Sequence, residues 1–334
     1  MLLPSPRGPF SESVIAALAQ RDPQRLIPME PGDVSDPVAD DDLQLALWVC
    51  YELHYQGFDD ADPTWEWQPE LISVRRSFEA ALLDALREQA VFPVSGRPVH
   101  HRLTDLVDSA DGPSLSRHIQ RHADLAQLRE VVIHRSAYQL KEADPHTWAI
   151  PRLTGRAKAA LVEVQADEYG GGDPDRMHSE LYRGLMRGLG LDDSYGAYID
   201  VVAGTGLAVS NVMSMFGLRR DLRGALVGHL AAYEMTSSQP CRRYAKALRR
   251  LGGNDDTCRF YDEHVVADAL HEQLAMHDLC GNLVEQEPDQ TEMIMFGAAT
   301  SLYVDSRFAE QVLASWECGR SSLFRWQTAG RVVA

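Results

Sequence analysis

Residues 260–280 have the sequence FYDEHVVADALHEQLAMHDLC. Within this stretch His264, Asp268 and His271 are spaced at i, i+4 and i+7. On a helix that turns by about 100° per residue, these three side chains lie within roughly 60° of one another on one face. Two imidazoles and a carboxylate on one face of a helix could supply half of a metal site. The simpler alternative is a polar helix face in contact with water.

Length and composition indicate a folded globular protein. The chain has 334 residues, of which 45% are apolar and 24% are charged, enough for one large domain or two ordinary ones. Its net charge of −17 argues against binding nucleic acid or an anionic membrane through bulk charge. No apolar run approaches the length of a transmembrane helix, so we expect no membrane span.

The cellular location is predicted from two further features. The first residues, MLLPSPRGPF, lack a basic region followed by an apolar one, so we expect no secretory signal. The five cysteines are scattered and form no CxxC motif, a pattern typical of reduced thiols in a cytoplasmic protein.

Apolar periodicity predicts an all-α protein, because no stretch shows sustained alternation of apolar and polar residues. Helices are expected at residues 11–21, 43–55, 69–89, 114–143, 157–168, 177–189, 195–217, 221–236, 239–251, 260–280 and 292–316. A boundary is placed near Gly112. Gly204 and Gly206 lack the third glycine and the preceding strand of a dinucleotide-binding loop, so they predict close helix packing.

Further candidate ligands lie at the ends of predicted helices. Glu142 and Glu168 each end a helix, and Glu168 is followed by the glycine turn of residues 170–172. His178 lies in the first turns of the next helix. Taken singly, such glutamates are usually solvated.

Glu234 differs, because it lies in the mostly apolar sequence LRGALVGHLAAYEM. A buried carboxylate is costly unless a cation offsets its charge. The alternative is that Glu234 caps a helix or pairs with Arg242 or Arg243 at the surface.

Together these candidates comprise three histidines and four carboxylates. Mixed imidazole and carboxylate ligands suit iron or manganese, and the set is sufficient for two ions with a bridging carboxylate. A helical bundle is the natural scaffold for such a site. The ferritin-like version needs two Glu-x-x-His motifs, whereas this chain has only Asp175…His178 and Asp268…His271 at that spacing. A dinuclear site would therefore belong to a different helical fold.

Three segments carry a resemblance to a known family. They are LKEADPHTWAIPRLTGRAKAALVEVQADEYGGGDPDRMHSELYRGLMRGLGLD (140–192), YEMTSSQPCRRYAKALRRLGG (233–253) and FYDEHVVADALHEQL (260–274). They resemble the heme-oxygenase-like diiron oxidase/oxygenase family, and most closely its N-oxygenating branch, which includes N-nitrosourea-forming enzymes. The resemblance implies a heme-oxygenase-like helical bundle at residues 113–334 and a helical region at 1–112 that could mediate homodimerisation.

The resemblance also implies a cofactor and its ligands. These are two Fe(II) ions without heme, with O2 as co-substrate, bound by Glu142, Glu168, His178, Glu234, His264, Asp268 and His271. An external electron donor is expected. No catalytic side chain beyond these ligands is identified.

The activity that follows is a non-heme diiron N-oxygenase. It would oxidise the nitrogen of a small amine, guanidine or amino-heterocycle to a hydroxylamine, nitroso or nitro product, in the biosynthesis of an antibiotic or other specialised metabolite. One alternative is desaturation, C–C cleavage or oxidative cyclisation of an amino or fatty acid by the same cofactor. Another is a non-catalytic helical binding protein. No cupin follows the bundle, so we expect no nitroso-forming rearrangement in a second domain.

Residues that contact the substrate are harder to predict. Tyr138, Met213, Phe216, Tyr233 and Tyr303 could line a pocket, although each could equally be a core residue. Arg320 could bind a substrate carboxylate, or it could form a structural ion pair. We predict Arg320 and Tyr303 as substrate-binding residues.

Overall fold

The computed structural model describes residues 1–26 and 31–324, apart from the side chains of residues 33 and 267–269. This part of the chain is helical and contains no β-strand, which confirms the all-α prediction. The α-helices are α1 (Pro9–Gln20), α2 (Asp41–Glu52), α3 (Pro69–Gln89), α4 (Val99–Asp108), α5 (Leu115–Arg121), α6 (Leu125–Gln139), α7 (Asp144–Thr147), α8 (Gly155–Glu168), α9 (His178–Gly188), α10 (Gly204–Leu218), α11 (Arg223–Arg250), α12 (Asp255–Gln273), α13 (Asn282–Gln286) and α14 (Thr291–Glu317). A π-helical segment, η9 (Leu274–Gly281), joins α12 to α13.

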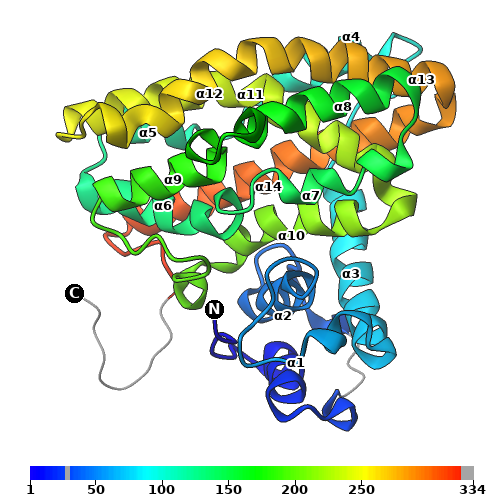
Figure 1. Cartoon of the computed structure of the whole chain (residues 1–334), viewed down its shortest axis with the longest axis vertical. Coiled ribbons are helices and arrows are strands. Elements are labelled where there is room, and N and C mark those ends of the chain that lie inside the picture. The colour runs from blue at the N-terminus through cyan, green and yellow to red at the C-terminus, as the bar shows by residue number, and fades with distance from the viewer. Residues whose placement is uncertain (27–30, 325–334) are drawn as a thin grey trace.

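Helix α11 is the element around which the bundle packs. It contacts α12 and α14 extensively and also contacts α5. Helix α9 packs on α12, and α8 packs on η9. Helices α1, α2 and α3 lie together at one end of the molecule, where α2 packs against α10 (Figure 1). Helix α4 contacts α14 and η9. The division of the chain near Gly112 remains a prediction.

Two glycines allow α11 and α14 to approach closely. A Cβ atom added at Gly228 would lie 1.8 Å from the carbonyl oxygen of Ile294, and one at Gly297 would lie 1.9 Å from that of Ala225. Any side chain at either position would force the two backbones apart. This contact fixes the position of α11 in the bundle.

Close packing also explains the glycines near the start of α10. A Cβ atom at Gly204 would lie 2.8 Å from the carbonyl oxygen of Ala39, and one at Gly206 would lie 3.0 Å from a Val202 methyl group and 3.1 Å from Nδ1 of His134. The predicted packing role of this pair is confirmed. Helix α10 begins at Gly204, whereas the pattern predicts a start near residue 195.

Helix α11 is continuous, whereas the sequence predicts two helices that end and begin near residues 236–239. Pro240 lies inside it and cannot donate the backbone hydrogen bond that the Thr236 carbonyl would otherwise accept. Helices α12 and α14 both pack extensively against α11. Tertiary packing therefore maintains a helix that local propensity would end.

The predicted helix at 114–143 is instead divided into α5, α6 and a turn before α7. Asp124 makes a capping box with Gln127, in which each side chain bonds to the backbone N–H of the other residue, and this starts α6. The turn at residues 140–143 contains Glu142. The break therefore places Glu142 within a turn and not on the face of a helix.

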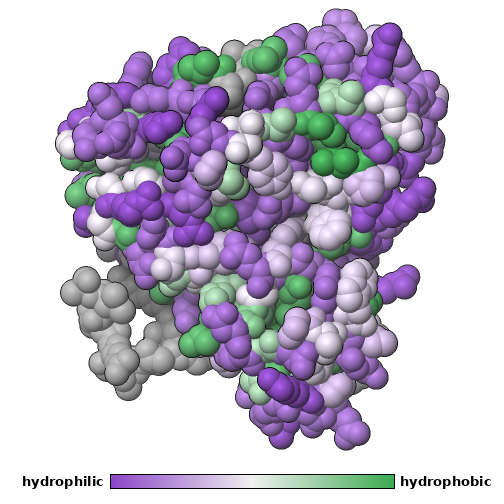
Figure 2. Space-filling model, viewed as in Figure 1, coloured by the Kyte–Doolittle hydropathy of each residue, from purple (hydrophilic) through white to green (hydrophobic). Residues whose placement is uncertain are grey.

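The surface is mixed and largely hydrophilic on the face shown in Figure 2, where hydrophobic residues occur in small groups. Among the described residues, no helix is both long enough and apolar enough to cross a membrane. The five cysteines form no disulfide with one another.

The glycine contact between α11 and α14 gives a stability prediction. Gly297→Ala should lower the free energy of unfolding by on the order of 3 kcal/mol, because the added methyl group meets backbone that cannot move aside cheaply. Gly184→Ala is the matched control, since its Cβ would meet only an arginine side chain at 3.9 Å in α9. The control should be neutral or stabilising by up to about 1 kcal/mol. Urea unfolding measures both, and equal stability of the two variants would contradict the prediction.

Candidate metal centre

Four predicted ligands converge into a first group. Ligand atoms of Glu142, Glu168, His178 and His264 all lie within 4.8 Å of one another. Nδ1 of His178 lies 2.7 Å from Oε2 of Glu168, and Nε2 of His264 lies 3.4 Å from Oε1 of Glu142. The group therefore combines two carboxylates with two imidazoles from α8, α9, α12 and the turn after α6.

A second group shares Glu168 with the first. It consists of Glu168, Glu234 and His271, whose ligand atoms also lie within 4.8 Å of one another. Nδ1 of His271 lies 3.4 Å from Oε2 of Glu234 and 3.8 Å from Oε1 of Glu168. The two oxygens of Glu168 thus face different groups, which is the arrangement of a bridging carboxylate.

The turn after α8 explains how Glu168 meets His178. Gly170, Gly171 and Gly172 have φ values of 67°, 63° and 89°, a left-handed conformation that glycine adopts without strain. A Cβ atom at Gly170 would lie 2.7 Å from backbone atoms of Arg176 and Met177. The glycine run therefore folds the chain back on itself, so that the last residue of α8 faces the first residue of α9.

The two imidazoles on α12 are oriented by hydrogen bonds on their far side. Nδ1 of His264 lies 2.7 Å from the Phe260 carbonyl oxygen, which can only accept, so this nitrogen carries the proton and Nε2 faces Glu142 with its lone pair. Nε2 of His271 donates to Oδ2 of Asp167 at 3.1 Å, so Nδ1 of the same ring faces the second group. Partners of this kind commonly fix the tautomer of a metal-binding histidine.

Sequence reasoning missed Asp167, although it precedes Glu168 directly. It also missed the support of Glu142, whose Oε1 accepts from the Tyr138 hydroxyl at 3.3 Å. The Gln139 amide nitrogen, with the amide oriented as a donor, lies 2.7 and 3.0 Å from the two oxygens of Glu142. Only the three-dimensional arrangement identifies these supporting residues.

Glu234 and Asp268 are predicted ligands from different elements, α11 and α12. Glu234 is buried and faces His271, whereas the alternative interpretation places it at the surface beside Arg242 or Arg243. The side chain of Asp268 lies outside the described residues, so its assignment as a ligand remains a prediction.

The donor set fits a transition-metal centre. Glu168, His178, Glu234, His264 and His271 are all buried. Nδ1 of His178 is close to Glu168, but the angles between the two side chains are not those of a hydrogen bond. Nδ1 of His271 is also buried without a partner in hydrogen-bond geometry. Buried carboxylates and imidazoles that face a common point suit iron or manganese.

Electrostatics within the cluster favour charged ligands. Burial alone would lower the pKa of His271, but the close Glu234 carboxylate, the hydrogen bond to Asp167 and the charge of Glu168 raise it to about 9. Burial would raise the pKa of Glu168, but the positive charges of His178, His264 and His271 hold it below its ordinary value. In the absence of metal, protons on the imidazoles would therefore balance part of the carboxylate charge.

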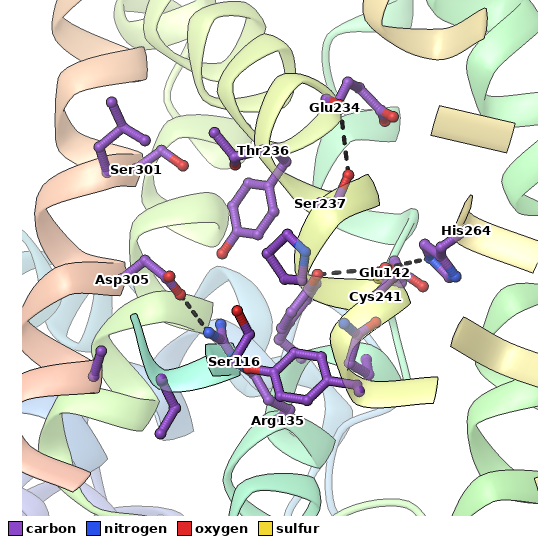
Figure 3. A pocket seen from close by; sticks show the side chains of 18 of the residues that line it. Ser116, Arg135, Glu142, Glu234, Thr236, Ser237, Cys241, His264, Ser301 and Asp305 are labelled. Carbon is purple, nitrogen blue, oxygen red and sulfur yellow. Dashed lines mark hydrogen bonds and ion pairs between the residues drawn. The ribbon is translucent and has the colours of Figure 1, made fainter. Parts of the chain in front are cut away.

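A cavity of about 530 Å³ leads to the cluster. Its lining includes Glu142, Glu168, Glu234 and His264 as well as polar residues from α5, α6 and α14. Figure 3 shows His264, Glu142 and Glu234 on one side of this space and Arg135, Ser116 and Asp305 on the other. The volume is in the range of small-molecule binding sites.

The predicted substrate contacts are only partly among the lining residues. Tyr138, Met213 and Tyr233 line the cavity, whereas Phe216, Tyr303 and Arg320 are absent from its described lining. The Tyr303 hydroxyl accepts from Arg307 at 2.7 Å, and Arg320 is exposed near the end of α14. Substrate binding by Tyr303 and Arg320 remains a prediction without support from the cavity.

Comparison with known proteins agrees with this geometry. The sequence profile of a family described as iron-containing redox enzymes matches residues 129–306. The chain is also similar to nitrosourea synthase of Streptomyces achromogenes subsp. streptozoticus, with 28% identity over 150 residues. That alignment covers 45% of this chain and only 32% of the longer synthase. Since the family match includes more than half of the chain and the ligand groups lie within it, the protein belongs to the iron-containing redox enzymes of heme-oxygenase-like fold and is an oxidoreductase.

Proposed function

We propose that the protein is a non-heme diiron oxygenase that oxidises the nitrogen of a small amine, guanidine or amino-heterocycle. The observation that carries the proposal is the position of Glu168, which directs one carboxylate oxygen to each of two ligand groups. The similarity to nitrosourea synthase supports nitrogen as the site of oxidation.

The two groups would each hold one iron ion. Glu142, His178 and His264 would bind the first, and Glu234 and His271 the second, with Glu168 between them. Asp268 is a further predicted ligand on α12. When bound, two ferrous ions would supply the electrons that activate O2. An external donor would then return electrons to the iron ions.

The protein's own groups prepare this centre. The bonds from His264 to Phe260 and from His271 to Asp167 hold each imidazole with a lone pair toward the cluster. Burial, followed by the charge of Glu142, raises the pKa of Tyr138 far above its ordinary value, so this phenol stays neutral and donates to Glu142. Tyr138 therefore positions a ligand and does not act as a base.

The cavity would bring the reacting nitrogen to the ligand side. Bound iron ions would offset the charge of the carboxylates there, and bulk water is limited because Glu168, Glu234 and His264 are buried. An amine must lose its proton before its lone pair can react. The apolar and aromatic lining would stabilise the neutral form.

Iron stoichiometry tests the ligand assignment. Anaerobic titration of the wild type should give about two Fe(II) ions per chain. His264→Ala should lose the ion of the first group, His271→Ala that of the second, and Glu168→Ala should weaken both. The exposed His122→Ala is the matched control and should bind iron like the wild type. Equal iron binding by all four variants would refute the assignment.

The pH dependence of iron binding follows from the pKa of His271. Below about 9 the metal-free imidazole holds a proton that the metal-bound imidazole cannot hold. Iron uptake should therefore release protons, and the logarithm of the affinity should rise by about one per pH unit for each proton displaced. Anaerobic titrations at about pH 6, 7 and 8 with a pH indicator measure both effects. An affinity that is independent of pH in this range would contradict the prediction.

Isotope labelling tests the reaction. With a panel of amines, a reductant and labelled O2, the nitrogenous product should carry the heavy oxygen isotope, as mass spectrometry would show. Desaturation or oxidative cyclisation would instead consume O2 and leave the organic product unlabelled. An unlabelled product from an accepted substrate would exclude N-oxygenation.

A further inference from the structure

Three arginines line the cavity, and they differ in their partners. Arg135 on α6 forms an ion pair with Asp305 on α14, and its guanidinium lies 4.7 Å from the Phe308 ring centre. Arg117 and Arg243 form no ion pair with any carboxylate in the described part of the chain. Within the described residues, two of the three guanidinium charges therefore have no carboxylate partner.

These two arginines lie near each other. Burial, followed by the charges of Arg117 and others nearby, lowers the pKa of Arg243. Nη1 of Arg243 donates to Oγ of Ser116 at 3.2 Å and to Oγ of Ser114 at 3.5 Å. Arg117 is exposed and Arg243 is half-buried, so water screens much of their mutual repulsion and both guanidinium groups remain available to an anion in the cavity.

This cationic region lies away from the ligand side of the cavity. Ser116, which bonds to Arg243, appears in Figure 3 beside Arg135 and Asp305 and opposite Glu234 and His264. The adjoining residues 110–113 also line the cavity and are exposed, so this side is the mouth. A local concentration of positive charge is notable in a chain with a net charge of −17.

We infer that Arg117 and Arg243, together with the Ser116 hydroxyl, bind a carboxylate group of the substrate at the mouth of the cavity. The planar guanidinium fork matches the two oxygens of a carboxylate. If the proposed function holds, on which this part of the inference rests, the reacting nitrogen lies at the other end, beside Glu142 and Glu234. The substrate class is then an amine that carries a carboxylate at its far end.

Anaerobic binding to the Fe(II)-loaded protein tests the inference without turnover. The probes are ε-aminocaproate and hexylamine, which have the same chain length and differ in the carboxylate. Calorimetry should show that the wild type prefers ε-aminocaproate. Arg243→Gln should bind it about tenfold more weakly, as expected for the loss of one charge-assisted hydrogen bond, and should bind hexylamine like the wild type. Arg117→Gln should act in the same direction.

Arg242→Gln is the matched control, because Arg242 is the exposed neighbour of Arg243 and does not line the cavity. It should bind both probes like the wild type. The inference is overturned if the wild type shows no preference for the carboxylate, or if the Arg243 and Arg117 variants retain it. The binding experiment contains no O2 and therefore does not depend on the reaction. If the carboxylate preference is found here but the separate labelling experiment gives an unlabelled product, only the proposed function is refuted.

Discussion

Burial of like-charged carboxylates is the constraint on which the rest of this structure depends. Glu142, Glu168 and Glu234 come from separate elements and reach one cluster, where removal of each charge from water costs several kcal/mol. Hydrogen bonds from Tyr138 and Gln139 offset part of that cost at Glu142, and protons or cations near the cluster can offset the rest, since the three imidazoles are placed to bind either. Without metal, the raised pKa of His271 reflects this charge balance, because a proton on the imidazole offsets part of the carboxylate charge. The positions of α8, α9, α11 and α12 are thus coupled to what the cluster binds.

Local periodicity allowed part of this cluster to be predicted. The spacing of His264 and His271 is sufficient because a helix fixes their relative direction. The glycine run predicts the end of the helix that carries Glu168, whereas the reversal that brings Glu168 to His178 is seen only in the structure. Asp167 could not be predicted as a partner of His271, because a contact between α8 and α12 depends on tertiary packing. The same holds for the cavity arginines, which lie on α5, α6 and α11 and come together only in the folded bundle.

Helix α11 shows why its continuity could not be inferred from Pro240. On the side of α14, Gly228 allows backbone contact that fixes the helix in place. On the side of the cavity, Thr236, Ser237 and Pro240 form part of the lining, where one helical hydrogen bond is missing. A helix held firmly by its packing against α14 tolerates the loss of this one hydrogen bond. Local sequence rules account for the effect of Pro240 but not for the tertiary packing of the helix.

The charges along the cavity give it a direction. The ligand cluster lies at one end, where bound cations would offset the carboxylate charge, and Arg117 and Arg243 lie at the mouth, so the cavity has a positive entrance. A molecule with a carboxylate at one end and an amine at the other has one favourable orientation there, because the arginines hold the carboxylate at the mouth and the amine points to the cluster, whereas a simple amine has no group for the arginines to hold. Orientation of this kind lowers the barrier by holding the reacting atom in place before reaction. The net negative charge of the whole chain is therefore a poor guide to its substrate, because the groups that line the cavity determine which molecule enters and how it lies.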